Sequence, residues 1–187
     1  MSLIDHFALI APIYDRVFKS QGHKKLIELA DLPEVGVFLD AGGGTGRVAQ
    51  YIKQPNSHVI VADSSEKMLE QSGLKEGLIN VCSQTEYLPF RNESFERIIM
   101  VDALHHVYDH QQSLKELFRV VKFGGKIVIE EPNIKRIPVK IIAFIEKITL
   151  MRSKFITPIQ LKSFIDNEPA RVKIEKEKMM YWVIIEK

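Results

Sequence analysis

The chain has 187 residues, 45% of them hydrophobic and 27% charged, which is the balance of a globular domain rather than a disordered chain. A formal net charge of +2 and a length suited to one domain exclude a strongly acidic or basic protein and a multidomain one. The single cysteine, Cys82, excludes an internal disulfide and zinc sites built from paired cysteines; we expect it to be a buried filler.

Four short apolar runs predict buried strands. Each is rich in β-branched residues and uninterrupted, as in parallel strands that helices cover on both faces. The runs span residues 35–40, 58–63, 97–102 and 126–131. Helices are predicted between them at residues 46–53, 65–71 and 112–121, the last from its apolar residues at helical spacing. This alternation predicts a doubly wound α/β sheet with right-handed crossovers.

The end of the chain has a different pattern. Phe123-Gly124-Gly125 predicts the end of a helix and a turn into the next strand. Helices are predicted at 138–151 and 158–165, each with a proline in its first turn. The alternating run at 171–177 and the apolar run at 180–186 predict an antiparallel hairpin at one edge of the sheet. No linker divides the chain, so residues 1–187 are expected to form one domain.

A glycine-rich segment follows the first predicted strand, at the end of the sheet where α/β proteins bind ligands. Its pattern is D-x-G-x-G-x-G, from Asp40 through Gly42 and Gly44 to Gly46. Glycines let the backbone turn sharply and let a ligand approach it closely. The spacing is one residue shorter than the dinucleotide fingerprint, which argues against a nicotinamide oxidoreductase.

Two aspartates indicate what this segment binds. Asp40, two positions before the first glycine, suits a cationic amino group better than a pyrophosphate. Asp63 ends the second strand, a position that commonly accepts hydrogen bonds from ribose hydroxyls. An amino acid at one end and a ribose at the other describe S-adenosylmethionine.

The sequence resembles the class I S-adenosylmethionine-dependent methyltransferases, in the branch that includes the ubiquinone/menaquinone C-methyltransferases. The matching blocks are LDAGGGTGRVAQYI at 39–52, VIVADSSEKMLEQ at 59–71, YLPFRNESFERIIMVDALHHV at 87–107 and LKELFRVVKFGGKIVIEEP at 114–132, with HFALIAPIYD at 6–15 as a lead-in. The resemblance implies a Rossmann-like, doubly wound, mainly parallel seven-stranded sheet with helices on both faces. It also implies N-terminal cap helices within residues 1–30 and a substrate-side insertion at 133–170.

The resemblance implies a set of cofactor-binding residues: Tyr14, Asp40, Ala41, Gly42, Gly44, Gly46, Asp63, Ser64, Met68, Gln84, Thr85 and Val101. Within this set, Ser64 and Met68 would flank the adenine, and Tyr14 would cover the cofactor from the N-terminal segment. The family usually has Asp-Ala where this chain has Gln84-Thr85. The Gln84 amide oxygen can still accept a hydrogen bond from the adenine amino group, without the charge.

Methyl transfer mainly requires alignment and exclusion of water, and a base only where the acceptor must lose a proton. The catalytic candidates follow the strand at 97–102, and they are His106, His105 and Asp102. A histidine suits an enol, a phenol or an activated carbon acid. We expect His105 to pack under the following helix and His106 to line the pocket, whereas Asp102 either lines the pocket or caps a helix. His106 and His110 lack an acidic partner for a metal site, so no metal is expected.

The predicted function is methyl transfer from S-adenosylmethionine to a small-molecule carbon or oxygen acceptor, quinone-like or aromatic, with S-adenosylhomocysteine as product. An RNA or tRNA methyltransferase and a non-catalytic S-adenosylmethionine- or S-adenosylhomocysteine-binding protein remain as alternatives. No Asn-Pro-Pro-aromatic motif follows the strand at 97–102, which counts against methylation of an amide or base nitrogen.

The charges are divided unevenly along the chain, which bears on possible partners. Residues 1–132 hold 14 Lys/Arg and 18 Asp/Glu, and residues 133–187 hold 12 and 6. We expect the insertion to be a lid over a small acceptor; peripheral contact with an anionic membrane surface and pairing in a homodimer remain open. The tail lacks the aromatic–basic interleaving of a nucleic-acid face. With no signal peptide or spanning segment apparent, a cytoplasmic protein is expected, monomeric or homodimeric.

Overall fold

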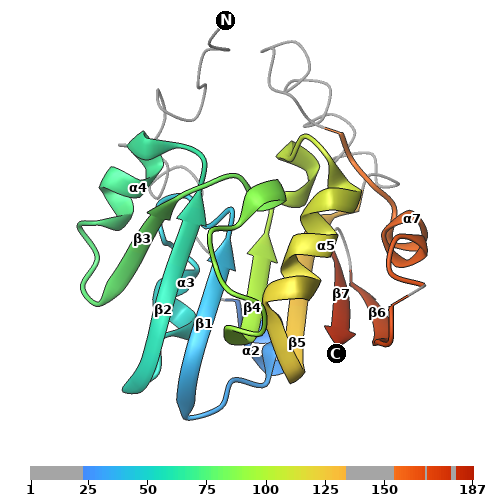
Figure 1. Ribbon diagram of the computed structural model, residues 1–187, viewed down its shortest axis with the longest axis horizontal. Helices are drawn as coiled ribbons and strands as arrows, with labels where there is room; N and C mark the ends of the chain where they lie inside the picture. The colour runs from blue at the N-terminus through green and yellow to red at the C-terminus, as the bar shows by residue number, and fades with distance from the viewer. Residues whose placement is uncertain (1–22, 134–153, 167, 178–179) are drawn as a thin grey trace, which may run out of the picture.

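The computed structural model describes residues 23–133, 154–166, 168–177 and 180–187, which contain one seven-stranded sheet in the order β3-β2-β1-β4-β5-β7-β6 (Figure 1). The strands are β1 (Val35–Ala41), β2 (Asn56–Asp63), β3 (Leu78–Cys82), β4 (Phe95–Val101), β5 (Val121–Pro132), β6 (Arg171–Glu177) and β7 (Met180–Glu186). The first five are parallel, and β7 pairs antiparallel with both β5 and β6. The predicted fold class is confirmed.

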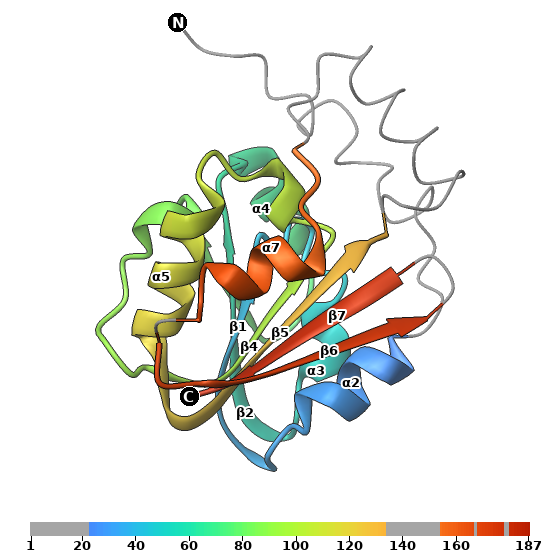
Figure 2. The ribbon, with the colours of Figure 1, turned by 90° about the vertical axis from the view of Figure 1, so that its right-hand side faces the viewer.

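Helices cover both faces of the sheet because successive strand residues point to opposite sides. On one face α2 (Lys24–Ala30) and α3 (Ala49–Ile52) pack over Phe38, together with part of α4 (Glu66–Ser72). On the other face α5 (His110–Val120) and α7 (Pro158–Ser163) pack over Leu39. Figure 2 shows these two layers on either side of the sheet.

Side-chain caps mark the starts of α4, α5 and α7. The Ser65 side chain accepts a hydrogen bond from the Met68 N–H at the start of α4. The Asp109 carboxylate accepts from the Gln112 N–H at the start of α5. At α7, Thr157 and Gln160 form a reciprocal capping box. Two 3-10 turns, η1 (Thr85–Tyr87) and η2 (Leu104–His106), follow β3 and β4.

The structure departs from the sequence-based elements at several places. β3 was not among the predicted runs, and the helix predicted at 46–53 is only the four residues of α3. The predicted turn at Phe123–Gly125 is instead an irregularity within β5, which runs on directly from α5. Cys82 is exposed, so its prediction as a buried filler was wrong.

Parts of the expected substrate region lie outside the described residues. These are Tyr14 with most of the N-terminal cap, and the helix predicted at 138–151 within the insertion. Within the described residues, no helix has both the length and the apolar composition needed to span a membrane.

Candidate functional site

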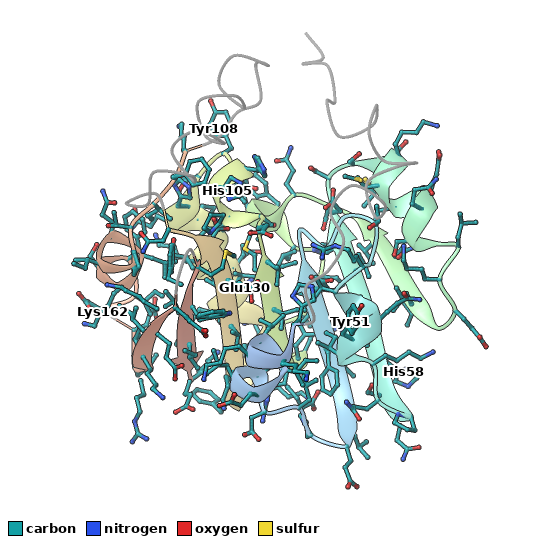
Figure 3. The ribbon with its side chains drawn as sticks, turned by 180° about the vertical axis from the view of Figure 1, so that it is seen from behind. Tyr51, His58, His105, Tyr108, Glu130 and Lys162 are labelled. Atoms are coloured by element: carbon teal, nitrogen blue, oxygen red, sulfur yellow. The ribbon has the colours of Figure 1, made fainter. Side chains whose placement is uncertain are left out.

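Five carboxylates lie at the carboxyl ends of four neighbouring strands. Because β2, β1, β4 and β5 are parallel and adjacent, their last residues meet at one edge of the sheet. From β2 to β5 these acids are Asp63, Asp40, Asp102, Glu130 and Glu131. We call this row the acidic edge. In Figure 3, His105 lies at this end of the sheet and His58 lies at the opposite end.

The glycine loop, residues 40–46, borders the acidic edge, and its three alternate glycines differ in surroundings. Gly42, Gly44 and Gly46 all have positive φ, at 67°, 54° and 71°. A Cβ on Gly42 would lie 2.6 Å from the Ala103 Cβ, and one on Gly46 would lie 2.5 Å from the Ser72 Oγ. A Cβ on Gly44 would meet only an Asp63 oxygen, at 3.9 Å. The outer glycines therefore permit close packing, whereas the backbone at Gly44 can be approached by a ligand.

Asp63 connects this loop to the start of α4. Its Oδ2 accepts a hydrogen bond from the Gly44 N–H, and its Oδ1 accepts one from the Ser65 N–H, both at 2.8 Å. Each carboxylate oxygen has capacity for a second donor. The carboxylate is therefore fixed in place at the end of β2, where the sequence analysis expects the ribose hydroxyls.

Asp40 is buried, with 1% of its surface exposed, and its Oδ2 has no hydrogen-bond partner among the described residues. The pKa of Asp40 is raised to about 7, mainly by burial and also by the charge of Asp63, while the Ala49 N–H and Arg47 oppose the rise. A buried carboxyl oxygen without a partner is costly unless a ligand satisfies it. A cationic ammonium group, as predicted from the sequence, fits this oxygen.

Asp102 follows β4 with φ of 51°, an unusual conformation for a residue other than glycine. Its Oδ1 is buried and has no partner among the described residues. Burial raises the pKa of Asp102 to about 7, and the neighbouring Glu131 and Glu130 add to the rise. Asp102 does not cap η2, which begins after Ala103 without a side-chain cap. Asp102 was expected either to line the pocket or to cap a helix, and the geometry favours the first role.

A polar group that sequence reasoning missed lies between the glycine loop and β5. An Arg47 guanidinium nitrogen is 3.2 Å from the His23 Nε2, and the Trp182 Nε1–H donates to Glu130 at 2.6 Å. Burial, and then the charge of Arg47, lowers the pKa of His23 to about 4. His23 is therefore neutral at pH 7 and accepts from Arg47. Burial raises the pKa values of Asp40, Asp102 and Glu130, and the Arg47 charge partly offsets that rise.

The two histidines after β4 occupy different environments. His105 is 3% exposed, and its Nδ1 lies 2.6 Å from the Glu131 Oε2. His106 is half-buried, with its ring centroid 4.0 Å from that of His105. His105 is therefore buried in the turn that follows β4, against a carboxylate that the sequence analysis did not single out. Two consecutive glutamates ending a buried strand were the available signal.

The remaining predicted cofactor residues line the same edge or lie just behind it. Ser64 and Gln84 are exposed, and the buried members are Ala41, Met68, Thr85 and Val101. Within the part of the chain that the structure describes, no cluster of three or more His, Cys, Asp or Glu residues could hold a metal ion.

Known proteins share this sequence pattern and fold. A methyltransferase-domain family model matches residues 39–129. The chain is 32% identical over 155 residues to the demethylmenaquinone methyltransferase of Thermotoga maritima. The aligned region covers 77% of this chain and 67% of that protein. The chain is 30% identical over 115 residues to the ubiquinone/menaquinone biosynthesis C-methyltransferase UbiE of Saccharophagus degradans, covering 56% of this chain and 46% of that protein.

A solved structure adds the comparison of folds. The crystal structure of an S-adenosylmethionine-dependent methyltransferase from Thermotoga maritima superposes with a TM-score of 0.78 over 97% of each chain, at 22% identity. At that identity the likeness concerns the fold. The chain spans 67% of the length of the first curated relative and 46% of the second.

Proposed function

Because this chain belongs to the class I S-adenosylmethionine-dependent methyltransferases, we propose that it transfers the methyl group of S-adenosylmethionine to a ring carbon of a quinol-like small molecule. The observation that carries this proposal is the glycine loop beside the acidic edge, in a chain whose curated relatives are named for quinone substrates. Methylation of an oxygen on the same class of acceptor requires the same cofactor site.

The residues at the acidic edge fit the cofactor. Asp40 and Asp102 each have a buried oxygen without a partner among the described residues, and S-adenosylmethionine carries an ammonium and a sulfonium. Asp63 is fixed where it can accept from ribose hydroxyls, and Gly44 leaves room for the ligand. When bound, the sulfonium supplies the methyl carbon; the C–S bond pair stays on sulfur, and the acceptor carbon exchanges its proton for the methyl group.

The chain's own contribution is orientation, exclusion of water and removal of a proton. A quinol ring carbon is a weak nucleophile until a ring hydroxyl ionises, because the phenolate donates electron density into the ring. The acceptor site therefore needs a proton-accepting group next to the cofactor site. We assign this role to the histidines of the turn that follows β4, His105 and His106.

The test is transfer of a labelled methyl group. We expect the protein, given S-adenosyl-L-[methyl-14C]methionine and chemically reduced 2-prenyl-1,4-naphthoquinone without oxygen, to label the naphthoquinol. The oxidised quinone is the matched control and should stay unlabelled, because it has no hydroxyl to ionise. Label in added tRNA and none in the naphthoquinol would contradict the proposal. So would tight S-adenosylhomocysteine binding with no transfer to either.

A further inference from the structure

A histidine–glutamate pair is buried between η2 and β5, next to the glycine loop. The Glu131 Oε2 lies 2.6 Å from the His105 Nδ1, and its Oε1 accepts a hydrogen bond from the Leu104 N–H at 2.7 Å. Both residues are almost wholly buried, with 1% and 3% of their surfaces exposed. A single carboxylate therefore orients both the backbone and the ring of the turn that follows β4.

The imidazole of His105 also packs against two aromatic rings. The His106 ring lies 4.0 Å away between centroids, tilted by 48°, and Phe155 stacks at 4.5 Å with only 9° between the planes. The Lys154 N–H donates to the His105 carbonyl at 2.7 Å, which fixes the backbone as well. A ring held in this way loses little further freedom when it meets a reactant, which is what catalysis by positioned groups requires.

Stability alone does not account for the pair. Burying a carboxylate and an imidazole usually stabilises a fold less than apolar side chains of similar volume would. Glu131 sits at the end of a strand whose preceding interior positions are isoleucine and valine. Buried ionisable pairs at the ligand-binding edge of a sheet are frequent in functional sites.

The geometry assigns the hydrogen. A carboxylate can only accept, so the His105 Nδ1 carries the hydrogen and Nε2 carries the lone pair. The same arrangement fixes the tautomer of catalytic histidines in other enzymes, where the carboxylate also stabilises the ring once it is protonated. The turn is close to the cofactor loop, because Ala103, two residues before His105, packs directly against Gly42.

We propose that His105, positioned by Glu131, is the general base of this site, taking the hydroxyl proton of a phenol- or quinol-type acceptor on Nε2. The proposal rests on the proposed function and narrows it to acceptors that must lose a hydroxyl proton. That proton moves to Nε2, its bonding pair stays on the acceptor oxygen, and the ring carbon forms the bond to the methyl group. The proton on that carbon then passes to solvent, its bonding pair restores the aromatic ring as a phenolate, and Nε2 returns the hydroxyl proton to the oxygen. Glu131 is a positioning residue that acts through His105.

Other ionisable groups surround the pair and enter its pH dependence. Asp102, from the end of β4, interacts electrostatically with both His105 and Glu131. Glu131 also interacts with His110 at the start of α5 and with Tyr181 on β7. Among the described residues, the surroundings also include Glu130 on β5, His106 next to the ring, and Lys154, whose N–H donates to the His105 carbonyl.

The test compares Glu131→Gln and His105→Gln with two controls, Glu177→Gln and His58→Gln, whose side chains are exposed. In Glu131→Gln the side chain keeps its volume, but its single oxygen can accept from only one of the two N–H groups. Three properties are measured on the full chain: S-adenosylhomocysteine affinity by calorimetry, the histidine tautomers by 15N NMR, and kcat against pH with the reduced 2-prenyl-1,4-naphthoquinone. The His105 signal is assigned by its loss in His105→Gln.

We expect His105→Gln to lower kcat by at least about a hundredfold and Glu131→Gln by at least about tenfold, with cofactor affinity within about twofold of wild type. In Glu131→Gln the acidic limb of the kcat profile should move to lower pH, because the carboxylate that favours the protonated ring is gone. The NMR spectrum should report Nδ1–H in the wild type and a changed tautomer in Glu131→Gln. A purely structural pair would change its tautomer in the same way, but it would leave the pH limb where it is and would not lower kcat.

Several results would overturn the proposal. An Nε2–H tautomer in the wild type, or full turnover in His105→Gln, would remove His105 from the role of base. An unchanged pH limb in Glu131→Gln would remove Glu131 as its positioning residue. A wild-type protein that labels no naphthoquinol would instead overturn the proposed function, and with it this role. Even if no naphthoquinol is labelled, the tautomer measurement still shows whether His105 is paired with Glu131.

Discussion

At the scale of single residues, Asp40 is the side chain whose burial most clearly lowers the unfolding free energy. It is buried beneath the glycine loop, with a Cβ on Gly43 excluded by a 2.6 Å approach to its carboxyl carbon. Its Oδ2 has no partner among the described residues, and burial raises its pKa to about 7. A residue in that state destabilises the protein without cofactor and favours binding of a cation.

The pH dependence of stability tests this account of Asp40. An aspartate whose native pKa lies above its ordinary value holds a proton in the native state that the unfolded chain has released. Stability therefore falls as pH rises from about 4 to about 7, and the full cost is present above pH 7. Because asparagine cannot ionise, Asp40→Asn should exceed the wild type in unfolding free energy by about 2–4 kcal/mol at pH 8, and equal it near pH 4. Urea denaturation across this range measures the difference.

The difference between Asp40→Asn and the wild type is needed because other groups titrate in the same pH range. Asp102 contributes in the same direction as Asp40, whereas His23, with its pKa lowered to about 4, makes stability rise with pH between about 4 and 6.5. The wild-type profile alone mixes these effects, and the difference between variant and wild type removes them. Glu34→Gln, at an exposed site with no ion pair among the described residues, is the control for loss of one carboxylate and should change the unfolding free energy little across this range. A constant difference for Asp40→Asn would contradict the account.

The sequence could predict some site residues and not others, for a physical reason. Asp40, the three glycines and Asp63 stand at fixed distances along one strand–loop–helix–strand unit, so their spacing carries the information. Glu131 contacts His105 from 26 positions away, and Arg47 contacts His23 from 24. Such contacts depend on how strands and helices pack, which no local pattern records.

At the scale of elements, the same distinction holds. The strands with two covered faces and the hairpin at 171–177 and 180–186 were predictable, because buried strands are apolar and the hairpin alternates. β3 is a five-residue edge strand with mixed exposure, so its pattern is weak. α3 is short because three of the five residues before Arg47 are glycines in left-handed conformation, which do not continue a helix.

Packing of the glycine loop against α4 and β3 gives a prediction at this scale. Gly46 and Gly124 have nearly the same φ, 71° and 73°, but a Cβ would meet Ser72 and Leu78 at the first and nothing within 4 Å at the second. Alanine at Gly124 should cost about 1–2 kcal/mol of unfolding free energy for the left-handed conformation alone. Alanine at Gly46 should cost about 1–3 kcal/mol more, because Ser72 and Leu78 must move.

Denaturant midpoints of Gly46→Ala and Gly124→Ala provide the measurement, with Gly124→Ala serving as the control for backbone strain. Equal destabilisation in the two variants would mean that the loop is not packed against α4 and β3 as described.

At the scale of the whole molecule, the basic character of residues 133–187 is partly accounted for within the fold. Lys173 pairs with Glu175, and Lys162 with Asp166. Lys187 donates to the carbonyls of Phe118 and Val121 near the end of α5, where a cation is favoured by the helix dipole. These contacts support a solvated, internally paired face for this part of the tail. A contact with an anionic membrane surface or a second copy remains a proposal that concerns the insertion.

The described residues build the sheet and the glycine loop, whereas the expected substrate region, residues 1–30 and 133–170, lies largely outside them. We propose that the acidic edge and the glycine loop bind the adenosyl cofactor. Substitution of Asp63 probes this binding most directly. The Asp63 carboxylate orders the loop through the Gly44 N–H and lies at the expected position of the ribose.

Calorimetric titration of S-adenosylhomocysteine into wild type, Asp63→Ala and the exposed control Asp166→Ala tests this claim most directly. We expect binding to the wild type and to Asp166→Ala with equal affinity. Binding to Asp63→Ala should be at least about tenfold weaker, because hydrogen bonds to a charged group contribute about 1.5–3 kcal/mol each. Wild-type affinity in Asp63→Ala, or binding of NAD in place of S-adenosylhomocysteine, would contradict the account.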